Sequence, residues 1–209
     1  MNRPYLLFDF DGTIADSIRP LYELMNRLAP RFGREPISWE EFDQLRDMNA
    51  AQIVKHLKVP FSKMASAVPM VLSEYHKIVH ELQPCAGIVE LLNNLSENKI
   101  SYALLSSNKS ENVSAFLGRF NLGGFEWVEG TNGILAKHRR LAHQIRKHQL
   151  HKNELYYIGD ESRDIEAAKR CKIKVIAVTW GFHTEAHLRA AQPDYLVSEP
   201  AEILRIVRP

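Results

Sequence analysis

The chain has 209 residues, of which 45% are hydrophobic and 25% are charged, and its formal net charge is +2. These values are typical of a globular protein and exclude a wholly disordered chain, and so small a net charge does not by itself indicate nucleic-acid binding. The two cysteines, Cys85 and Cys171, exclude a disulfide framework and a four-cysteine zinc site. No stretch reaches the roughly 18 apolar residues of a membrane span and no signal peptide is evident, so we expect a cytoplasmic protein without a membrane partner.

The first apolar run, residues 5–10, is rich in β-formers and predicts a buried strand. The following interval, residues 17–82, contains no convincing strand. The helical patterns within it cover residues 18–29, 39–46, 50–57 and 63–82. We therefore expect an all-helical domain at 17–82, inserted after the first strand into a core made of residues 1–16 and 83–209.

From residue 83 onward, apolar runs alternate with helical patterns. The predicted strands are 100–105, 125–128, 155–158, 175–179 and 195–197, and the predicted helices are 87–96, 111–120, 137–149, 163–171 and 201–207. Alternation of this kind is typical of an α/β fold in which helices cross between parallel strands. The expected fold class is therefore α/β, with a Rossmann-like parallel sheet and a small helical cap domain.

Two aspartates follow the first predicted strand. Asp9 and Asp11 lie two positions apart where the apolar run ends, so both side chains should point to the same side of the sheet. Like charges so placed repel each other unless a cation or a shared proton compensates them. Gly12 then lets the backbone turn sharply. The alternative interpretation is an ordinary turn at the end of a strand, with solvated aspartates.

A second acidic cluster, with Asp160 and Asp164, follows the predicted strand 155–158. In open α/β sheets, ligands bind beyond the carboxyl ends of the strands. If this strand neighbours the first one, Asp9 and Asp11 converge with the second cluster on one crevice. Clustered carboxylate oxygens suit Mg²⁺, so the sequence predicts a magnesium site that comprises these four aspartates.

Residues suited to a phosphate group follow two further predicted strands. Ser106, Ser107 and Asn108 offer polar groups just before a helix begins, and Lys137 lies at the start of a later helix. Each feature alone is weak, because such a loop is usually a helix cap and such a lysine is usually solvated. Their order matters, since each falls at the carboxyl end of a successive strand.

Taken together, the motifs Asp9–Thr13 (DFDGT), Ser106, Lys137 and Gly159–Asp164 (GDESRD) resemble the four motifs of the haloacid dehalogenase superfamily, specifically of its phosphatases. The resemblance covers essentially the whole chain and is greatest to the branch that resembles phosphoglycolate phosphatases. The helical insertion is similar in position and character to the small cap domain of that branch. Residues 157–182 are also similar, including the final Thr-Trp-Gly-Phe.

The resemblance implies a hydrolase that forms an aspartyl-phosphate. Asp9 would be the nucleophile, and Asp11 would protonate the leaving group and then activate water. Mg²⁺ would be held by the Asp9 side chain, the Asp11 carbonyl and Asp160, while Asp164 would orient water molecules around the ion. The substrate would be a small phosphorylated metabolite, phosphoglycolate or a sugar phosphate. The residues expected to bind its phosphate group are Gly12, Thr13, Ser106, Ser107, Asn108 and Lys137.

The same resemblance leaves alternatives open. A dehalogenase is disfavoured, because it needs no acid at the position of Asp11. A phosphomutase of the β-phosphoglucomutase kind uses the same two aspartates, but Leu21 and Ala50 stand where such mutases carry a histidine and an arginine. The other alternative is a phosphate-binding or partner-binding protein that has the fold without catalysis. Retention of the nucleophile and of the metal ligands argues against it.

Two charged segments remain. Arg46 lies in a predicted cap loop, beside an Asp47 where family members often have glycine. We interpret Arg46 as a solvated cation at a helix end, with a substrate contact as the alternative. The basic run 137–152 has an apolar stripe, which indicates a solvated helix face and not a nucleic-acid surface. The expected assembly is a monomer or a homodimer.

Overall fold

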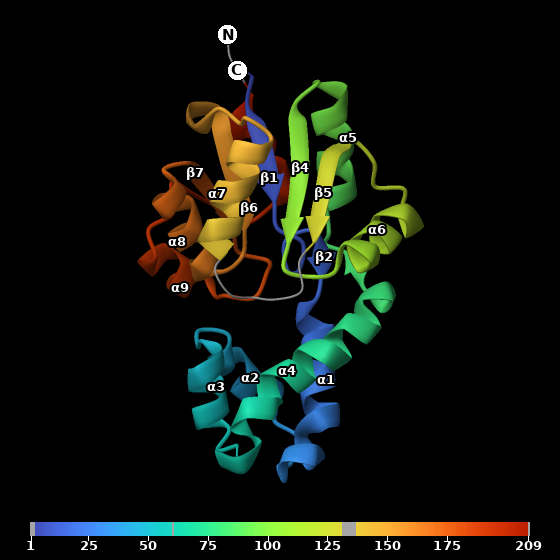
Figure 1. Cartoon of the computed structure of the whole chain (residues 1–209), viewed down its shortest axis with the longest axis vertical. Helices are drawn as coiled ribbons and strands as arrows, with labels where there is room; N and C mark the ends of the chain where they lie inside the picture. The colour runs from blue at the N-terminus through green and yellow to red at the C-terminus, as the bar shows by residue number, and fades with distance from the viewer. Residues whose placement is uncertain (1–2, 60, 131–136, 209) are drawn as a thin grey trace.

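The structure is a computed structural model that describes residues 3–59, 61–130 and 137–208. In this part of the chain, six strands form a parallel sheet in the order β5-β4-β1-β6-β7-β8 (Figure 1). Their bounds are Tyr5–Phe8 (β1), Ser101–Ser106 (β4), Phe125–Gly130 (β5), Leu155–Gly159 (β6), Lys174–Val178 (β7) and Tyr195–Val197 (β8). All six predicted strands are confirmed, with small shifts at their ends, and the fold class is α/β as predicted.

The strands are buried on both faces, and alternate residues belong to different cores. Leu6 and Phe8 of β1 belong to one hydrophobic cluster, whereas Leu7 belongs to the other. This follows from the two-residue period of a strand, and it explains why the strands appear in the sequence as continuous apolar runs.

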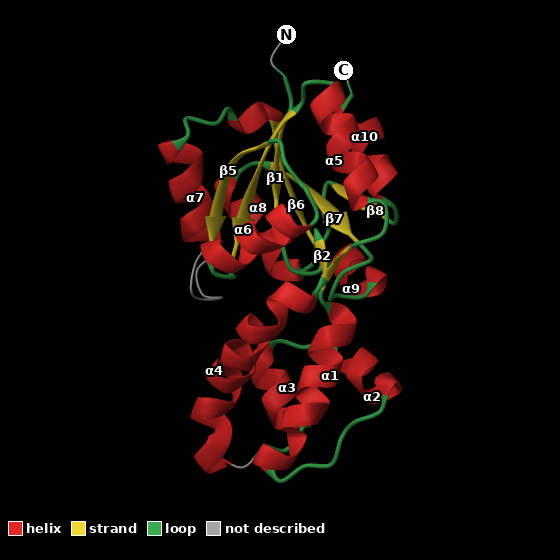
Figure 2. Cartoon of the chain, turned by 90° about the vertical axis from the view of Figure 1, so that its right-hand side faces the viewer, coloured by secondary structure: helices red, strands yellow, loops and turns green. Residues whose placement is uncertain are grey.

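Helices cover the two faces of the sheet in separate groups. The first group is α5 (Ile88–Glu97), α6 (Ser110–Arg119) and α10 (Pro200–Val207), and the second is α7 (Lys137–Lys147), α8 (Ser162–Cys171) and α9 (Glu185–Ala190). Figure 2 shows α5 and α10 on one side of the sheet and α7 on the other. The predicted helices are confirmed within a few residues. The short α9, which begins after the N-cap Thr184, was not predicted.

The inserted segment is helical, as predicted. It contains α1 (Ile18–Leu28), α2 (Trp39–Leu45), α3 (Ala50–His56) and α4 (Phe61–Ile78), with short 3₁₀ turns at Ala29–Phe32 and Val79–Glu81. Local signals set two helix starts, because the side chain of Ser38 caps α2 and that of Asn49 forms a capping box on α3. These helices lie beyond the carboxyl ends of the strands, in the lower half of Figure 1.

A two-stranded antiparallel ribbon joins the inserted helices to the rest of the chain. Ala15–Asp16 (β2) pairs with Gln83–Pro84 (β3), so the chain enters and leaves the inserted segment side by side. Neither strand was predicted from the sequence, since two residues are too few to show a hydrophobic period.

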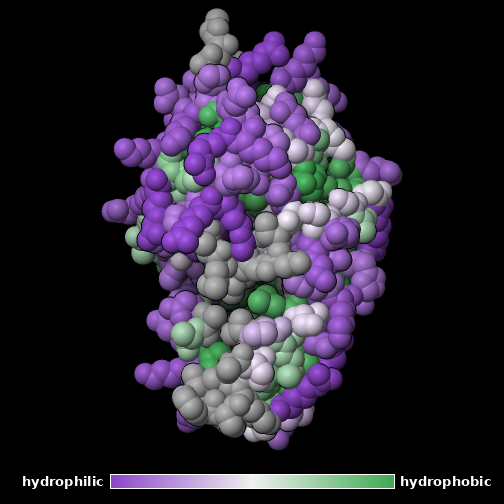
Figure 3. All heavy atoms as spheres, viewed as in Figure 1, coloured by the Kyte–Doolittle hydropathy of each residue, from purple (hydrophilic) through white to green (hydrophobic). Residues whose placement is uncertain are grey.

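The surface agrees with the interpretation of the basic run as a solvated face. Leu141 and Ile145 of α7 are buried, whereas Arg139, Arg146 and Lys147 are exposed. Figure 3 shows hydrophilic residues over most of this face of the molecule. None of the helices in the described residues is both long enough and apolar enough to span a membrane.

Candidate active site

The sheet brings the two acidic motifs together. Asp9 follows β1 and Asp160 follows β6, and the two residues come close because β1 and β6 are neighbouring strands. The backbone amide of Asp9 donates a hydrogen bond to the Ile158 carbonyl at 2.8 Å. Among the described residues, carboxylate oxygens of Asp9, Asp160 and Asp164 lie within 4.8 Å of one another. All three side chains are buried, so the interpretation as a solvated strand-end turn is wrong for Asp9.

The turn after β1 fits closely around Asp160. Gly12 has a φ of +71°, and a Cβ at this position would collide with the Asp160 carboxylate. Thr13 donates a hydrogen bond from its hydroxyl to Asp160 Oδ1 at 3.0 Å. Glycine is therefore needed both for the backbone conformation and for the close approach. In the structure, these two residues line and hold the carboxylate of Asp160.

Lys137 begins α7 and reaches into the carboxylate cluster. Its Nζ lies 2.6 Å from Asp9 Oδ2 and is also paired with Asp164 Oδ1. The side chain is only 9% exposed, so Lys137 is not the solvated helix residue that a lysine at this place usually is. It compensates two of the three buried carboxylates.

The electrostatics of the cluster follow from its burial. Burial raises the pKa of Asp9, and Lys137 acts in the opposite direction. The pKa of Asp160 is well above its usual range because of burial and of the neighbouring charges of Glu161, Asp164 and Asp9. Burial lowers the pKa of Lys137, but the two adjacent carboxylates outweigh it and hold that pKa well above its ordinary range. One ammonium therefore does not fully compensate the cluster.

This donor set fits a magnesium ion. Mg²⁺ prefers hard oxygen ligands and binds through a small number of carboxylates. Asp9 and Asp160 supply such oxygens, and their carboxylate oxygens lie within 4.8 Å of each other. Asp164 is engaged at both oxygens, because Oδ2 accepts from the Glu161 amide at 3.0 Å and Oδ1 pairs with Lys137. Its geometry therefore suits a role in orienting neighbouring groups.

Asp11 is not one of these three clustered carboxylates and has a different hydrogen-bond partner. Its Oδ1 accepts a hydrogen bond at 2.7 Å from the hydroxyl of Tyr75, which belongs to α4. Burial raises the pKa of Asp11 to about 6, while Tyr75 and Asn108 lower it. A carboxyl with such a pKa carries a proton for part of the time near neutral pH, as a general acid requires. Tyr75 was missed from the sequence, because nothing distinguishes it from the other residues of a helical pattern.

The loop after β4 approaches the same edge of the sheet. Ser106 and Asn108 are buried. The backbone N–H of Asn108 donates to Ser106 Oγ at 2.9 Å, which forms a tight turn before α6. Ser106, Ser107 and Lys137 line one small recess together with Arg140 and Arg163. The structure thus brings Ser106 and Ser107, two of the three predicted phosphate-binding residues of this loop, next to Lys137.

The position of Arg46 differs from the solvated helix end that was expected from the sequence. Its side chain is 17% exposed and bridges to the rest of the molecule, where it donates to the carbonyls of Phe182 at 2.6 Å and of Gly181 at 3.0 Å. The prediction of a solvated cation is therefore wrong. Asp47 makes a second bridge, since it accepts from the hydroxyl of Thr184 at 2.8 Å.

The loop after β7, whose carbonyls accept hydrogen bonds from Arg46, also holds Asp160 in place. The Phe182 amide donates to Asp160 Oδ2 at 2.7 Å, and Gly181 packs so closely that a Cβ would collide with the Asp160 side chain. The neighbouring Trp180 donates from its indole nitrogen to the Thr13 carbonyl at 3.2 Å. The Thr-Trp-Gly-Phe segment thus holds Asp160 and the turn at Thr13 in place through hydrogen bonds and close packing. The sequence did not indicate this role.

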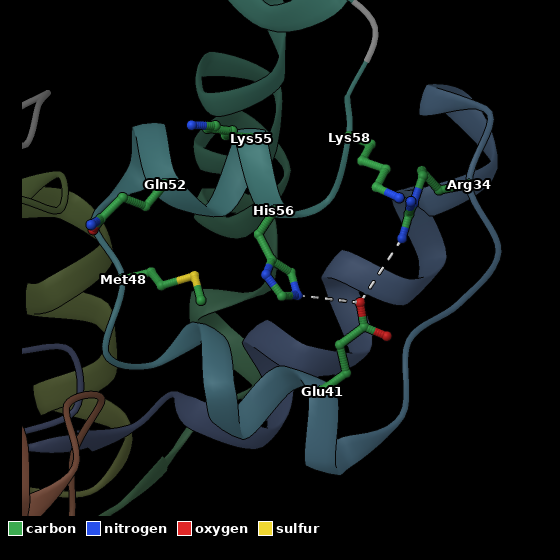
Figure 4. A pocket seen from close by; sticks show the side chains of 7 residues that line it. All are labelled: Arg34, Glu41, Met48, Gln52, Lys55, His56 and Lys58. Atoms are coloured by element: carbon green, nitrogen blue, oxygen red, sulfur yellow. Dashed lines mark ion pairs between the residues drawn. The ribbon is translucent and has the colours of Figure 1, made fainter.

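A larger groove lies on the inserted helices and is separate from the carboxylates. It measures about 640 Å³ and is lined by Arg34, Glu41, Met48, Gln52, Lys55, His56 and Lys58 (Figure 4). Glu41 faces two of the basic groups, with Oε1 at 3.9 Å from Arg34 and 3.8 Å from His56. Most of the side chains that line the groove are exposed, so the groove lacks the buried polar groups of a built binding site.

Comparison with known proteins agrees with the geometry. The family model for haloacid dehalogenase-like hydrolases matches residues 6–178. A phosphoglycolate phosphatase from Synechococcus elongatus is 34% identical over 203 residues, which cover 97% of this chain and 96% of that protein. Phosphoglycolate phosphatase 1 from Pseudomonas aeruginosa is 21% identical over 95% of this chain and 78% of its own length.

A solved structure shows the same fold. A haloacid dehalogenase-like family hydrolase from Streptococcus pneumoniae superposes with a TM-score of 0.83 at 22% identity, over 99% of both chains. At this identity the likeness concerns the fold alone.

Proposed function

The chain belongs to the haloacid dehalogenase-like hydrolase family and is a phosphoric monoester hydrolase, and we propose that it hydrolyses a small phosphate monoester with Mg²⁺ through an aspartyl-phosphate intermediate. The observation that carries the proposal is the meeting of Asp9, Asp160 and Lys137 in one buried cluster at the carboxyl edge of the sheet. A nucleophile, a hard-oxygen ligand and a cation for phosphate oxygens are the groups that this reaction needs.

In the first step, a carboxylate oxygen of Asp9 attacks phosphorus, and the bond between phosphorus and the ester oxygen breaks. Asp11 gives its proton to the departing alkoxide and becomes a carboxylate. In the second step, Asp11 takes a proton from a water molecule that attacks phosphorus, and the bond to Asp9 breaks. Inorganic phosphate leaves, and both aspartates return to their starting states.

The remaining polar residues would bind the phosphate group. Lys137 and Ser106 would hold its non-bridging oxygens, whose charge changes as the bonds form and break. Mg²⁺, bound by the Asp9 and Asp160 side chains and the Asp11 carbonyl, would screen Asp9 from its anionic target. Asp164 would keep Lys137 oriented and would hydrogen-bond to water around the ion. Gly12, Thr13, Ser107 and Asn108 would complete the phosphate-binding surface.

We propose phosphoglycolate or a sugar phosphate as the substrate class, on the support of the relatives named phosphoglycolate phosphatase. The test is a panel of small phosphate monoesters at neutral pH, with release of inorganic phosphate as the readout. We expect hydrolysis with Mg²⁺, no hydrolysis with a chelator, and inhibition by Ca²⁺. Ca²⁺ takes more ligands at longer distances, and this would disturb the alignment of Asp9 with phosphorus.

The panel also tests the alternatives. Transfer of phosphate between two positions of a sugar, without release, would support a mutase. Binding of Mg²⁺ by calorimetry, without turnover of any phosphate ester, would support a non-catalytic protein. Full hydrolysis in chelator would contradict the role of the metal.

We also propose that residues 17–82 act as a cap that opens and closes over a core of residues 1–16 and 83–209. Two features support this: both connections pass through the short β2–β3 ribbon, and side-chain hydrogen bonds from Arg46 and Asp47 reach the loop after β7. Closure would exclude water while the aspartyl-phosphate forms.

Arg46→Ala should weaken the use of Mg²⁺, because the lost hydrogen bonds anchor the loop whose Phe182 amide holds Asp160. We expect the Mg²⁺ concentration for half-maximal activity to rise about threefold to tenfold, which is part of the effect of losing charge-assisted hydrogen bonds. The rise in the Mg²⁺ concentration for half-maximal activity should be similar with aryl and alkyl phosphates as substrates. Arg19→Ala is the matched control, because Arg19 also lies on the cap but is exposed and pairs with Glu23.

The measurement is a Mg²⁺ titration of hydrolysis with each variant. If Arg46→Ala instead raised KM for one metabolite and left an aryl phosphate unchanged, Arg46 would contact substrate and the anchoring role would be wrong.

A further inference from the structure

We infer that Tyr75 is a positioning residue for Asp11: its hydroxyl fixes one carboxyl oxygen and so directs the other toward the leaving group. The inference rests on the proposed acid role of Asp11. Its basis is the hydrogen bond from Tyr75 to Asp11 Oδ1, at 2.7 Å between residues 64 positions apart in the sequence. Tyr75 is 8% exposed, so water competes little for this hydrogen bond.

The end of α4 that carries Tyr75 is anchored to the core. Asn112 of α6 donates from its side-chain amide to the carbonyl of His76 at 3.1 Å and also to Asn108 Oδ1 at 3.2 Å. The 3₁₀ turn that follows packs on α6, and its His80 carbonyl accepts from Arg119. This part of the inserted segment lies shortly before β3, close to the connection to the core. Tyr75 therefore has a defined place beside the catalytic carboxyl.

The hydrogen bond has a chemical consequence for proton transfer. A neutral carboxylic acid carries its proton on one oxygen, and an oxygen that already accepts from a phenol is the poorer place for that proton. Engagement of Oδ1 therefore favours the proton on Oδ2, which is the oxygen that must face the leaving group. Without Tyr75, Oδ1 of the partly buried carboxyl would lose its hydrogen bond to α4, and the carboxyl would be less fixed in orientation.

The test is Tyr75→Phe, which removes only the hydroxyl. Single-turnover phosphoryl transfer should slow by about tenfold or more for an alkyl phosphate, whose leaving group needs the proton, and by less than about threefold for an aryl phosphate. KM should change little, because in this inference the hydroxyl acts through Asp11 and not on the substrate itself. Tyr22→Phe is the matched control: Tyr22 also lies on the inserted helices and donates to the Ile37 carbonyl, and its variant should show no such difference.

A double-mutant cycle separates positioning from a general effect on the fold. Asp11→Ala removes the acceptor, whereas asparagine would still accept, so Tyr75→Phe should cause no further loss in the Asp11→Ala background. Equal losses for the two substrates, a faster alkyl reaction, or a loss that persists without Asp11 would overturn the inference.

A second readout does not depend on activity. Thermal unfolding of wild type, both single variants and the double variant should show non-additive shifts, because the two groups contact each other in the folded protein. Additive shifts would overturn the inference even if the chain is a phosphatase. Absence of hydrolysis by the wild type would instead refute the proposed function, and non-additive unfolding would still establish the contact.

Discussion

Asp9→Asn should abolish turnover while the fold is retained. The amide has no anionic oxygen to attack phosphorus, so neither the aspartyl-phosphate nor free phosphate can form. Loss of a nucleophile costs on the order of 10⁴-fold or more in rate, which leaves only the residual effect of binding. The fold should tolerate the change, because the substitution removes one charge from a cluster in which burial and the charge of Asp164 already raise the pKa of Asp9.

The measurement is phosphate release, together with trapping of the intermediate. A hydroxylamine quench of the wild-type enzyme in turnover should convert the acyl phosphate to a hydroxamate on Asp9, detectable by mass spectrometry, and the variant should show none. Asp16→Asn is the matched control, because Asp16 is exposed and lies outside the carboxylate cluster. A hydroxamate on another residue would refute the covalent role of Asp9. Hydrolysis by Asp9→Asn at the wild-type rate, once deamidation of the variant is excluded, would refute it as well.

Asp11→Asn should affect the two chemical steps differently from Asp9→Asn. General acid catalysis contributes about 10²- to 10⁴-fold, so single-turnover transfer from an alkyl phosphate should slow by about that factor. An aryl phosphate with a good leaving group needs little protonation and should lose much less in this step. Its aspartyl-phosphate should then accumulate, because activation of the attacking water also depends on Asp11.

Rapid-quench measurement of the first turnover with both substrates checks this prediction. The amide oxygen of the variant can still accept from Tyr75, so the fold and the contact with α4 should persist, and thermal unfolding serves as the control. Equal losses of the two substrates in the first turnover would exclude the acid role of Asp11.

Much of the fold was predictable because its signals are local. Each strand of the parallel sheet is buried on both faces, so it appears in the sequence as a continuous apolar run, and helix caps such as Asn49 mark where helices begin. The strands β2 and β3 were not predictable, because each has two residues and exists only through pairing with the other. The short α9 was missed for a similar reason, as its six residues span less than two turns.

The sequence by itself predicted that Asp9, Asp160 and Lys137 share one site, because residues that follow parallel strands meet at one edge of the sheet once the strands are neighbours. Only the tertiary structure decided which partner each group has. Tyr75 reaches Asp11, and Arg46 reaches carbonyls 135 and 136 positions away, across the boundary between the inserted helices and the sheet. Such contacts depend on how two separately patterned segments pack against each other, and hydrophobic periodicity within a segment carries no information about its orientation on another. Burial of Lys137 was decided in the same way, since a lysine at a helix start is solvated unless the packed chain brings carboxylates to it.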